Sequence, residues 1–276
     1  MIPRFAKYLA VNLGWTLTDK PDPAADVIYL SGYFEAQLLH PWPGKQKVAS
    51  YFTHKETNPP GNGKAKLYEA IAGRVDLRIA TAAMYAQGLV AYGPTIQANP
   101  PVERNKFTIP KRKPGGRLTA GFSGYSYSNG RKGEELAKVV IKSKPGQAVD
   151  WRASGRGWPI PTKRYTWAEM PAFYQSLDIL VVTSLVEGVP MPPLEVLSCG
   201  GSIVIPNGVG LLDELPATPG IHRYKRGNVE SLVKAFAQAV QMRPEVDRGA
   251  LRAVTEPYTI TAWCEQHQQA FEECFL

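Results

Sequence analysis

Short apolar runs alternate with amphipathic helical patterns along most of this chain, and this alternation limits its fold more than any other feature. The apolar runs are rich in β-branched and aromatic residues, which favour strands. They fall at 15–18, 27–30, 48–53, 77–80, 118–123, 148–152, 179–183, 202–205 and 220–224. The patterns between them predict helices at 3–13, 64–72, 82–91, 132–142, 167–176, 192–199, 229–242 and 261–275. Strands that alternate with helices are typical of an α/β protein with parallel sheets.

A connector rich in proline and glycine interrupts the alternation at residues 99–116. It contains four prolines and has no hydrophobic period. We therefore expect two Rossmann-like domains, residues 1–112 and 113–256, that face each other across a cleft. A carboxy-terminal helix within 257–276 is expected to pack back on the first domain. Ligands of such sheets bind beyond the carboxyl ends of the strands.

Several classes of protein are excluded by what the chain contains. Its three cysteines, Cys199, Cys264 and Cys274, form no C-x-x-C pair, and its four histidines show no H-E-x-x-H spacing. This argues against a disulfide framework and a metal site. The longest apolar stretch, 177–186, is about half the roughly 20 residues that span a bilayer, and the first residues lack a signal-peptide core. We expect a soluble protein of the reducing cytoplasm.

Positive charge is concentrated in the middle of the chain. The whole sequence has 32 Lys and Arg against 24 Asp and Glu, a net charge of +8. Residues 101–171 hold 15 basic and five acidic residues, so this segment carries +10 and the remainder −2. Such a segment predicts a surface for phosphate groups of a nucleotide, a nucleic acid such as DNA, or an anionic membrane. A face that merely keeps the protein in solution is the alternative.

The segment 177–214 contains the clearest candidates for functional residues. The predicted strand 179–183 leads into a loop with Glu187, and three prolines then suit the first turn of a helix that Gly200 ends. The free backbone N–H groups of a helix start favour an anion. Glu187 and Glu195 can face the same ligand, and carboxylates accept hydrogen bonds from sugar hydroxyls. The pattern predicts a nucleotide-sugar site, with two merely surface glutamates as the alternative.

The run E-G-V-P-M-P-P-L-E-V-L-S-C-G in this segment resembles the E-x7-E segment of retaining glycosyltransferases of the GT-B fold, in particular family 4. The dipeptide Lys132-Gly133, the run P-N-G-V-G-L-L-D-E and the run G-N-V-E-S-L-V-K-A-F fall in the family's order. The resemblance covers 118–240 and, more weakly, 5–107. It implies a retaining glycosyltransferase of the hexosyltransferase type, which moves a sugar from a nucleotide-diphosphate sugar to an acceptor hydroxyl and requires no metal or other cofactor.

The resemblance also implies roles for individual residues. Lys132 would neutralise the diphosphate leaving group, Glu187 would bind the sugar near the reacting centre, and His54 would touch the transferred sugar. Glu195 would bind the donor ribose. The rest of the donor-binding set comprises the backbone of three residues and one assisting cation: Gly188, Val189, Met191 and Arg131.

Two departures from the family are visible. The chain begins on what would be the family's first helix, so we expect the amino-terminal domain to lack the usual first strand. Tyr125 stands where the family has an arginine seven positions before the K-G lysine. A trimmed chain of this kind fits a viral or mobile-element gene, and a viral product would act in the host cytoplasm.

The acceptor is left open by the sequence. A modified base in phage-type DNA is one candidate because of the basic segment, and a lipid or surface glycan is another. A basic nucleic-acid-binding protein without enzymatic activity is a further alternative, although no known DNA-binding or RNA-binding pattern supports it. The last alternative is a degenerate transferase fold that binds the donor without turnover.

Trp151 and Trp158 lie near arginines and could stack on a base, but packing is the expected role of both.

Overall fold

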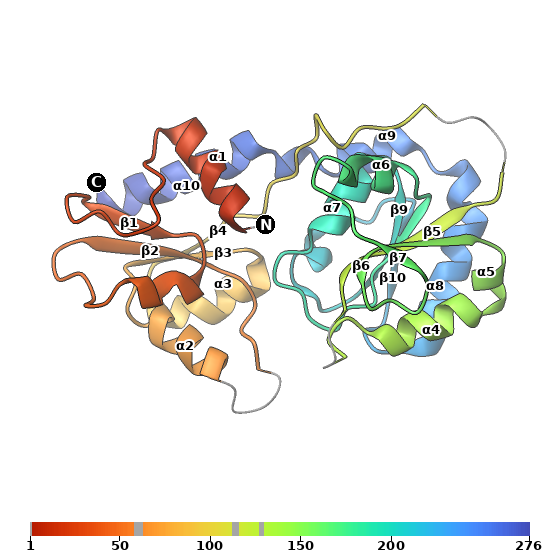
Figure 1. The fold of residues 1–276 in the computed structure, drawn as a ribbon, viewed down its shortest axis with the longest axis horizontal. Helices are drawn as coiled ribbons and strands as arrows, with labels where there is room; N and C mark the ends of the chain where they lie inside the picture. Colours follow the sequence, from red (N-terminus) through yellow and green to blue (C-terminus); the bar gives the residue numbers. More distant parts are fainter. Residues whose placement is uncertain (1, 58–62, 112–115, 127–129) are drawn as a thin grey trace. The chain divides into compact units, whose positions relative to one another are not determined.

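A computed structural model describes residues 2–57, 63–111, 116–126 and 130–276. The chain divides into two compact units, and each is described by itself (Figure 1). The first unit contains Met1–Pro101 together with Ile260–Leu276, and the second contains Val102–Thr259. Each unit is built on one parallel sheet, as the alternation of strands and helices predicts.

The first unit has a sheet of four described strands in the order β1-β2-β3-β4. They are β1 (Val27–Leu30), β2 (Lys47–Phe52), β3 (Leu77–Ala80) and β4 (Thr95–Gln97). Its α-helices are α1 (Ile2–Leu13), α2 (Gly63–Ala72), α3 (Ala83–Leu89) and α10 (Ile260–Phe275). Helices α1 and α10 lie over one face of the sheet, and α2 and α3 lie over the other (Figure 1).

Alternate residues of β2 supply the two cores of this unit. Val48 and Phe52 pack in the core beneath α2, where Phe52 contacts the ring of Tyr68. Tyr51 points to the opposite face and contacts Trp263 of α10. This two-residue period is the one expected of a strand that is covered on both faces.

The second unit has a sheet in the order β10-β9-β8-β5-β6-β7. The strands are β5 (Thr119–Tyr125), β6 (Asp150–Arg156), β7 (Thr162–Lys163), β8 (Ile179–Val181), β9 (Ser202–Pro206) and β10 (Ile221–Tyr224). The α-helices are α4 (Glu134–Lys142), α5 (Lys144–Gln147), α6 (Met170–Gln175), α7 (Met191–Ser198), α8 (Val229–Met242) and α9 (Arg248–Ala253). Short 3-10 turns occupy Tyr33–Leu38, Val90–Tyr92, Gly210–Glu214, Arg243–Glu245 and Glu256–Tyr258.

Trp151 and Trp158 belong to the core of the second unit, as expected for packing residues. The ring of Phe122 lies between them, with centroids 5.0 Å from Trp151 and 4.9 Å from Trp158. Trp151 also stacks on Phe236 of α8 at 5.2 Å. The indole N–H of Trp158 donates to the carbonyl of Gly124 at 2.9 Å. This aromatic column joins the sheet to its covering helix.

The predicted strand at 15–18 is wrong. These residues follow α1 without forming a strand, and Thr16, Leu17 and Thr18 are exposed. A strand needs a hydrogen-bonded neighbour, and none of the described residues pairs with this segment. The short strands β4 and β7 were not predicted, because two or three residues are too few to display a period.

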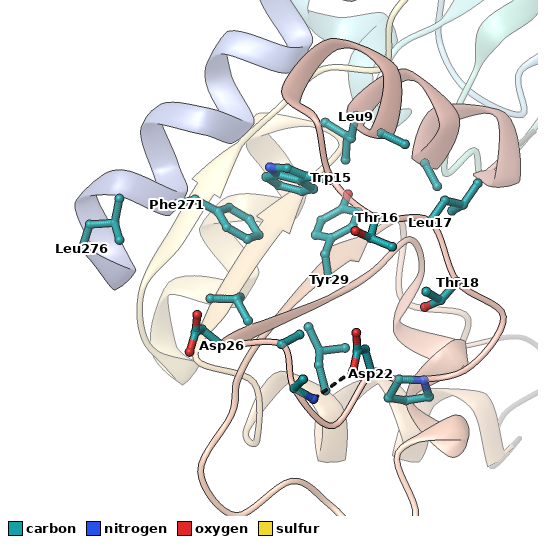
Figure 2. A pocket seen from close by; sticks show the side chains of 17 residues that line it. Leu9, Trp15, Thr16, Leu17, Thr18, Asp22, Asp26, Tyr29, Phe271 and Leu276 are labelled. Carbon is teal, nitrogen blue, oxygen red and sulfur yellow. Dashed lines mark hydrogen bonds between the residues drawn. The ribbon is translucent and has the colours of Figure 1, made fainter.

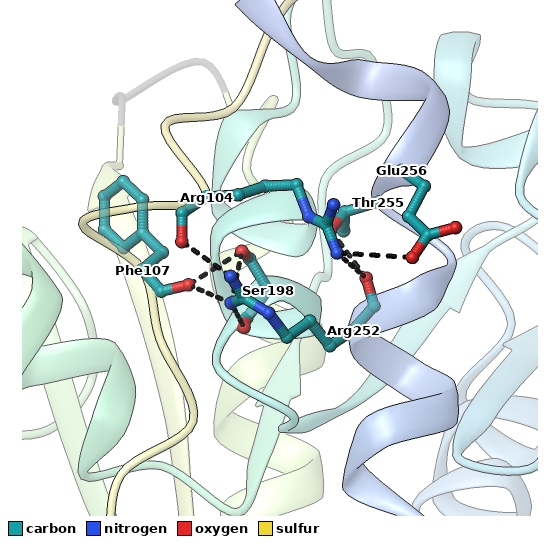
Figure 3. Close-up of polar contacts among 6 residues, drawn as sticks. All are labelled: Arg104, Phe107, Ser198, Arg252, Thr255 and Glu256. Carbon is teal, nitrogen blue, oxygen red and sulfur yellow. Dashed lines mark hydrogen bonds and ion pairs between the residues drawn. The ribbon is translucent and has the colours of Figure 1, made fainter.

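The connector packs on the second unit, as Figure 3 shows. The guanidinium of Arg252 in α9 donates to the carbonyls of Phe107 at 2.6 Å, Ser198 at 2.5 Å and Arg104 at 2.8 Å. The hydroxyl of Ser198 donates to the same Phe107 carbonyl at 2.8 Å. One arginine thus ties the connector to the end of α7. The structure divides the chain after Pro101, whereas the boundary expected at residue 112 lies outside the described residues.

Candidate functional site

The candidate site is built where β8 ends in the second unit. Strand β8 is fully buried, and Thr183 and Ser184 continue its path below the surface. Helix α7 begins at Met191, with prolines in its first turn, where the fixed backbone angle of proline suits a helix start. Every residue of α7 apart from Pro192 is buried. The loop between β8 and α7 is therefore held at both ends by the core.

Lys132 and Glu187 meet at this loop. The Lys132 ammonium forms an ion pair with Glu187 Oε1, and the two side chains are 13% and 11% exposed. The hydroxyl of Ser184 donates to the same carboxylate oxygen at 2.6 Å. A hydrogen bond to an ionised group is roughly twice as strong as one between neutral groups. Two of the three residues predicted as catalytic are thus brought together, although they are far apart in the sequence.

Gly133 explains how Lys132 reaches the loop. Its φ of +67° is a left-handed conformation that glycine adopts without strain. A Cβ atom at this position would lie 2.2 Å from the carbonyl oxygen of Thr183, so a larger residue would separate the two segments. The contact is completed from the other side, because the Thr183 hydroxyl donates to the Lys132 carbonyl at 2.6 Å. The Leu185 amide donates to the Arg131 carbonyl at 2.8 Å.

Glu195 lies in α7 and is 3% exposed. Its neighbour is the buried Tyr174, whose pKa is raised well above its ordinary value by burial and then by the Glu195 charge. The Tyr174 hydroxyl also lies 2.8 Å from Ser123 Oγ. Burial and the Glu195 charge raise the pKa of the Cys199 thiol to about 12. The carboxylate of Glu195 is therefore placed in an enclosed environment with hydroxyl groups.

The other predicted donor-binding residues occupy the loop and its neighbour. Gly188 is buried, and Val189 is half-buried. The Met191 side chain is fully buried, and its amide donates to the Val189 carbonyl at 2.9 Å. Arg131 directly precedes Lys132 and is half-buried. A small cavity at this point is lined by residues of β8, by Glu187 and by Pro190.

His54 is placed in the first unit. It follows β2 two residues after the strand ends at Phe52, and its side chain is half-buried. It therefore lies at the carboxyl end of a parallel strand, as the sequence predicts. The remaining predicted residues all belong to the second unit.

Sequence reasoning missed Thr183, Ser184 and Tyr174. The first two stand directly before the loop, in the run V-V-T-S-L-V-E-G, so their hydroxyls could have been noticed beside Glu187. Tyr174 carries no local signal, because its proximity to Glu195 arises from the packing of α6 against α7. These three uncharged residues contact the charged residues of the site: Ser184 contacts Glu187, Thr183 contacts Lys132, and Tyr174 lies beside Glu195.

The basic segment is distributed over several elements. Lys138 pairs with Glu135 at 2.6 Å, Arg117 with Asp150 at 3.5 Å and Lys163 with Glu169 at 3.9 Å, all with exposed side chains. Arg104 contributes to the packing of the connector. Arg112 and Lys113 lie outside the described residues. In the described part of this segment, acidic neighbours thus offset some of the positive charge.

The described residues contain neither a metal-binding group nor a membrane-spanning helix. No group of three or more His, Cys, Asp and Glu side chains in this part of the chain is arranged to hold a metal ion. No helix within it is both long enough and apolar enough to cross a bilayer.

One segment of this chain matches a known protein family, and its fold matches several solved structures. Residues 162–252, about a third of the chain, match the family model for glycosyl transferases group 1. No curated protein sequence matches the chain significantly. Among solved structures, sucrose-phosphate synthase from Thermosynechococcus elongatus is 14% identical, with a TM-score of 0.70 over 99% of this chain and 77% of that protein.

Two further structures contain nucleotides. HepE from Anabaena, in complex with UDP-glucose, is 12% identical, with a TM-score of 0.72 over 98% of this chain and 82% of its own. A mutant of TarM from S. aureus, in complex with fondaparinux, α-GlcNAc-glycerol and UDP, is 14% identical, with a TM-score of 0.73 over 89% of this chain and 55% of its own. The chain thus has the fold of GT-B glycosyltransferases, and a segment of its second unit matches the family model for glycosyl transferases group 1.

Proposed function

We propose that this protein is a retaining glycosyltransferase that moves a sugar from a nucleotide-diphosphate sugar to an acceptor hydroxyl without a metal ion. The observation that carries the proposal is the buried pair of Lys132 and Glu187 at the carboxyl end of β8. The pair places a cation and a hydroxyl-binding carboxylate at one point. Glu187 itself lies inside the segment that matches the glycosyltransferase family.

The reaction breaks the bond between the anomeric carbon and the diphosphate oxygen and forms a bond from that carbon to the acceptor oxygen. The acceptor proton passes to an oxygen of the leaving diphosphate. Negative charge grows on the diphosphate as the bond breaks, and the Lys132 ammonium stabilises it from a preorganised position. Lys132 in this role takes the place that a metal cation fills in other transferases.

Glu187 and Glu195 divide the binding of the donor between them. Carboxylates accept hydrogen bonds from sugar hydroxyls. The diphosphate competes with Glu187 for Lys132, so donor binding releases Glu187 to the hydroxyls of the transferred sugar. Glu195 accepts hydrogen bonds from the ribose.

UDP-sugars are the first donors to test, since one of the similar structures is in complex with UDP and another with UDP-glucose. The purified chain is incubated with UDP-glucose, UDP-galactose and UDP-GlcNAc in EDTA, and release of UDP is followed. Release of UDP from one donor is expected, and Lys132→Ala should release it about 10²- to 10³-fold more slowly. Binding of a donor without release by the unchanged protein would support a degenerate transferase instead. NMR of the product's anomeric proton tests retention.

The acceptor we propose is a hydroxyl on a glycan or lipid-linked glycan. A hydroxyl on a modified DNA base is the second candidate, favoured by the +10 charge of residues 101–171. The salt dependence of binding distinguishes the two candidate acceptors. Affinity for duplex DNA falls with a slope of about −0.9 per phosphate contact in a plot of log affinity against log salt. A flat salt dependence of turnover would exclude the DNA acceptor.

A further inference from the structure

Tyr174 of α6 belongs to a row of three hydroxyl groups that ends at the Glu195 carboxylate. Its hydroxyl lies 2.8 Å from Ser123 Oγ, which in turn lies 2.9 Å from Ser154 Oγ. The Tyr174 hydroxyl also makes a side-chain hydrogen bond with Glu195. Tyr174 and Ser154 are buried, and Ser123 is half-buried. This hydroxyl row, Ser154, Ser123 and Tyr174, thus runs from the sheet of the second unit to Glu195.

The two serines of the hydroxyl row come from neighbouring strands. Ser123 of β5 is in register with Ser154 of β6, so their side chains lie on the same face of the sheet. Ser123 is also one of the residues that line the small cavity beside Glu187. The hydroxyl row therefore connects the wall of this cavity with Glu195.

The Glu195 carboxylate fixes the direction of each hydrogen bond in the row. An ionised carboxylate only accepts hydrogen bonds, so Tyr174 donates its single proton to Glu195. Tyr174 then accepts from Ser123, and Ser123 accepts from Ser154. Burial raises the pKa of Tyr174, which keeps the phenol protonated and able to donate. Hydrogen bonds in such a chain strengthen one another, so the row holds the carboxylate in one orientation.

Two other tyrosines of the chain place their hydroxyls against neutral groups. Figure 2 shows Tyr29 in the wall of a cavity of the first unit, and its hydroxyl lies 3.1 Å from the neutral ring of His267. The Tyr224 hydroxyl donates to the Val182 carbonyl at 3.0 Å. Tyr174 donates to a charged group instead, and such a hydrogen bond is roughly twice as strong as a neutral one. Its hydroxyl is therefore suited to orient a functional carboxylate.

We propose that Tyr174 is a positioning residue that orients the Glu195 carboxylate toward the ribose and makes the site select ribonucleotides over deoxyribonucleotides. This inference rests on the proposed function and deepens it, because it names the class of nucleotide that the donor carries. A carboxylate offers about four acceptor positions, and the bond from Tyr174 fixes how the others are directed. A nucleotide without the 2′-hydroxyl lacks one donor for these positions. A buried acceptor that loses its donor weakens binding.

The test compares UDP, ADP and GDP with their 2′-deoxy forms by isothermal titration calorimetry. The pair whose ribonucleotide binds most tightly is used for the variants. We expect the unchanged protein to bind that ribonucleotide about tenfold more tightly than its deoxy form, a difference of about 1.4 kcal/mol. Tyr174→Phe removes the hydroxyl but keeps the ring, whose centroid lies 5.8 Å from that of Phe107. The ratio of the two dissociation constants should then fall to about twofold.

Matched variants separate positioning from general damage to the fold. A variant that merely loosens the site weakens both nucleotides equally, so the ratio of their dissociation constants reports the role of Tyr174. Tyr224→Phe removes a buried hydroxyl of the same unit and should leave the ratio unchanged. Ser123→Ala interrupts the hydroxyl row one step farther from Glu195 and should lower the ratio to about fivefold. Ser123→Ala decides the question if Tyr174→Phe does not fold.

A double variant tests whether Tyr174 acts through Glu195. Residues of one hydrogen-bond network have effects that do not add, and a double-mutant cycle measures the difference. We expect Tyr174→Phe combined with Glu195→Gln to bind the ribonucleotide within about twofold of Glu195→Gln alone. Fully additive losses would contradict the proposal, because they would mean that Tyr174 acts independently of the carboxylate.

Three results would overturn this inference alone. They are equal affinity of the unchanged protein for both forms, an unchanged ratio in folded Tyr174→Phe, and an equal fall of the ratio in Tyr224→Phe. In each case release of the nucleotide from a donor sugar would leave the proposed transferase in place. Failure of all six nucleotides to bind the folded protein would instead contradict the proposed donor site, and this inference with it.

Discussion

The Lys132 ammonium and the Glu187 carboxylate form an ion pair in which each side chain is almost nine-tenths buried. Ser184 donates to the same oxygen of Glu187, and Thr183 holds the main chain of Lys132. Salt and water screen such a pair less than an exposed pair. The geometry is therefore fixed by three neighbouring contacts, and each can be removed by a single substitution.

Replacing Lys132 tests the role of the cation. We expect Lys132→Ala to lower kcat by about 10²- to 10³-fold, because one preorganised donor contributes about 2.7 to 4 kcal/mol to a transition state. Donor affinity should fall much less. Steady-state kinetics of UDP release would measure both effects. Lys138→Ala, an exposed lysine of α4, is the matched control. Unchanged kcat in Lys132→Ala would contradict the assignment.

Ser184→Ala tests whether the orientation of Glu187 matters. The substitution removes one charge-assisted hydrogen bond, so we expect kcat to fall about tenfold, which corresponds to about 1.4 kcal/mol. The free energy of unfolding should change by about 1 kcal/mol. Ser176→Ala removes a hydroxyl bond to a helical carbonyl elsewhere in the unit and serves as control. Equal kinetic losses in both variants would make Ser184 a merely structural residue.

Glu195→Gln tests the binding of the donor ribose. Glutamine keeps the shape of the side chain but removes the charge that faces Tyr174, so we expect the donor Kd to rise about tenfold or more. Isothermal titration calorimetry with UDP would measure it. Glu230→Gln in the first turn of α8 is the control. If UDP binds Glu195→Gln as tightly as the unchanged protein, the carboxylate has another function.

The parts of the fold that the sequence predicted are those with a long, regular period. Residues 229–242 display such a period, and α8 spans the same residues. The stretch 15–18 has a strand pattern but lacks a paired neighbour, and pairing is a property of the tertiary fold. The residue pattern of one segment therefore cannot predict whether that segment pairs with another strand.

The candidate site was predictable in its residue types but not in its contacts. The resemblance in the segment around Glu187 suggested Lys132 and Glu195 as functional residues. The ion pair itself depends on the close approach of Gly133 to Thr183, which a local pattern does not contain. The environment of Glu195 depends in the same way on Tyr174, a residue of a different helix.

Arg252 should be the most sensitive position of the connector. Its guanidinium donates to three carbonyls, as Figure 3 shows, and Arg252→Ala would leave these partly buried acceptors without a charged donor. We expect a loss of about 3 kcal/mol in the free energy of unfolding, measured by urea denaturation. Arg226→Ala removes an exposed bond to the Gly208 carbonyl and should cost less than about 1 kcal/mol. Similar losses in both variants would contradict this role.

His267 should make the stability of the protein depend on pH. Its Nδ1 donates to the Trp263 carbonyl at 2.8 Å, so Nε2 of the neutral ring accepts from the Tyr29 hydroxyl at 3.1 Å. Burial lowers the pKa of His267 from 6.5 to about 4. The unfolded chain therefore binds a proton first as pH falls, and stability is complete above pH 6.5 and declines toward pH 4.

The size of this effect can be isolated with one variant. The lowered pKa corresponds to a loss on the order of 3 kcal/mol between pH 6.5 and 4, since one unit is about 1.4 kcal/mol. His267→Gln retains a donor and an acceptor but cannot take up the proton, so its unfolding free energy should fall less over this range. Urea denaturation at a series of pH values would compare the two proteins. Parallel pH profiles would mean that other groups, such as His222 with its pKa lowered by burial, cause the acid sensitivity.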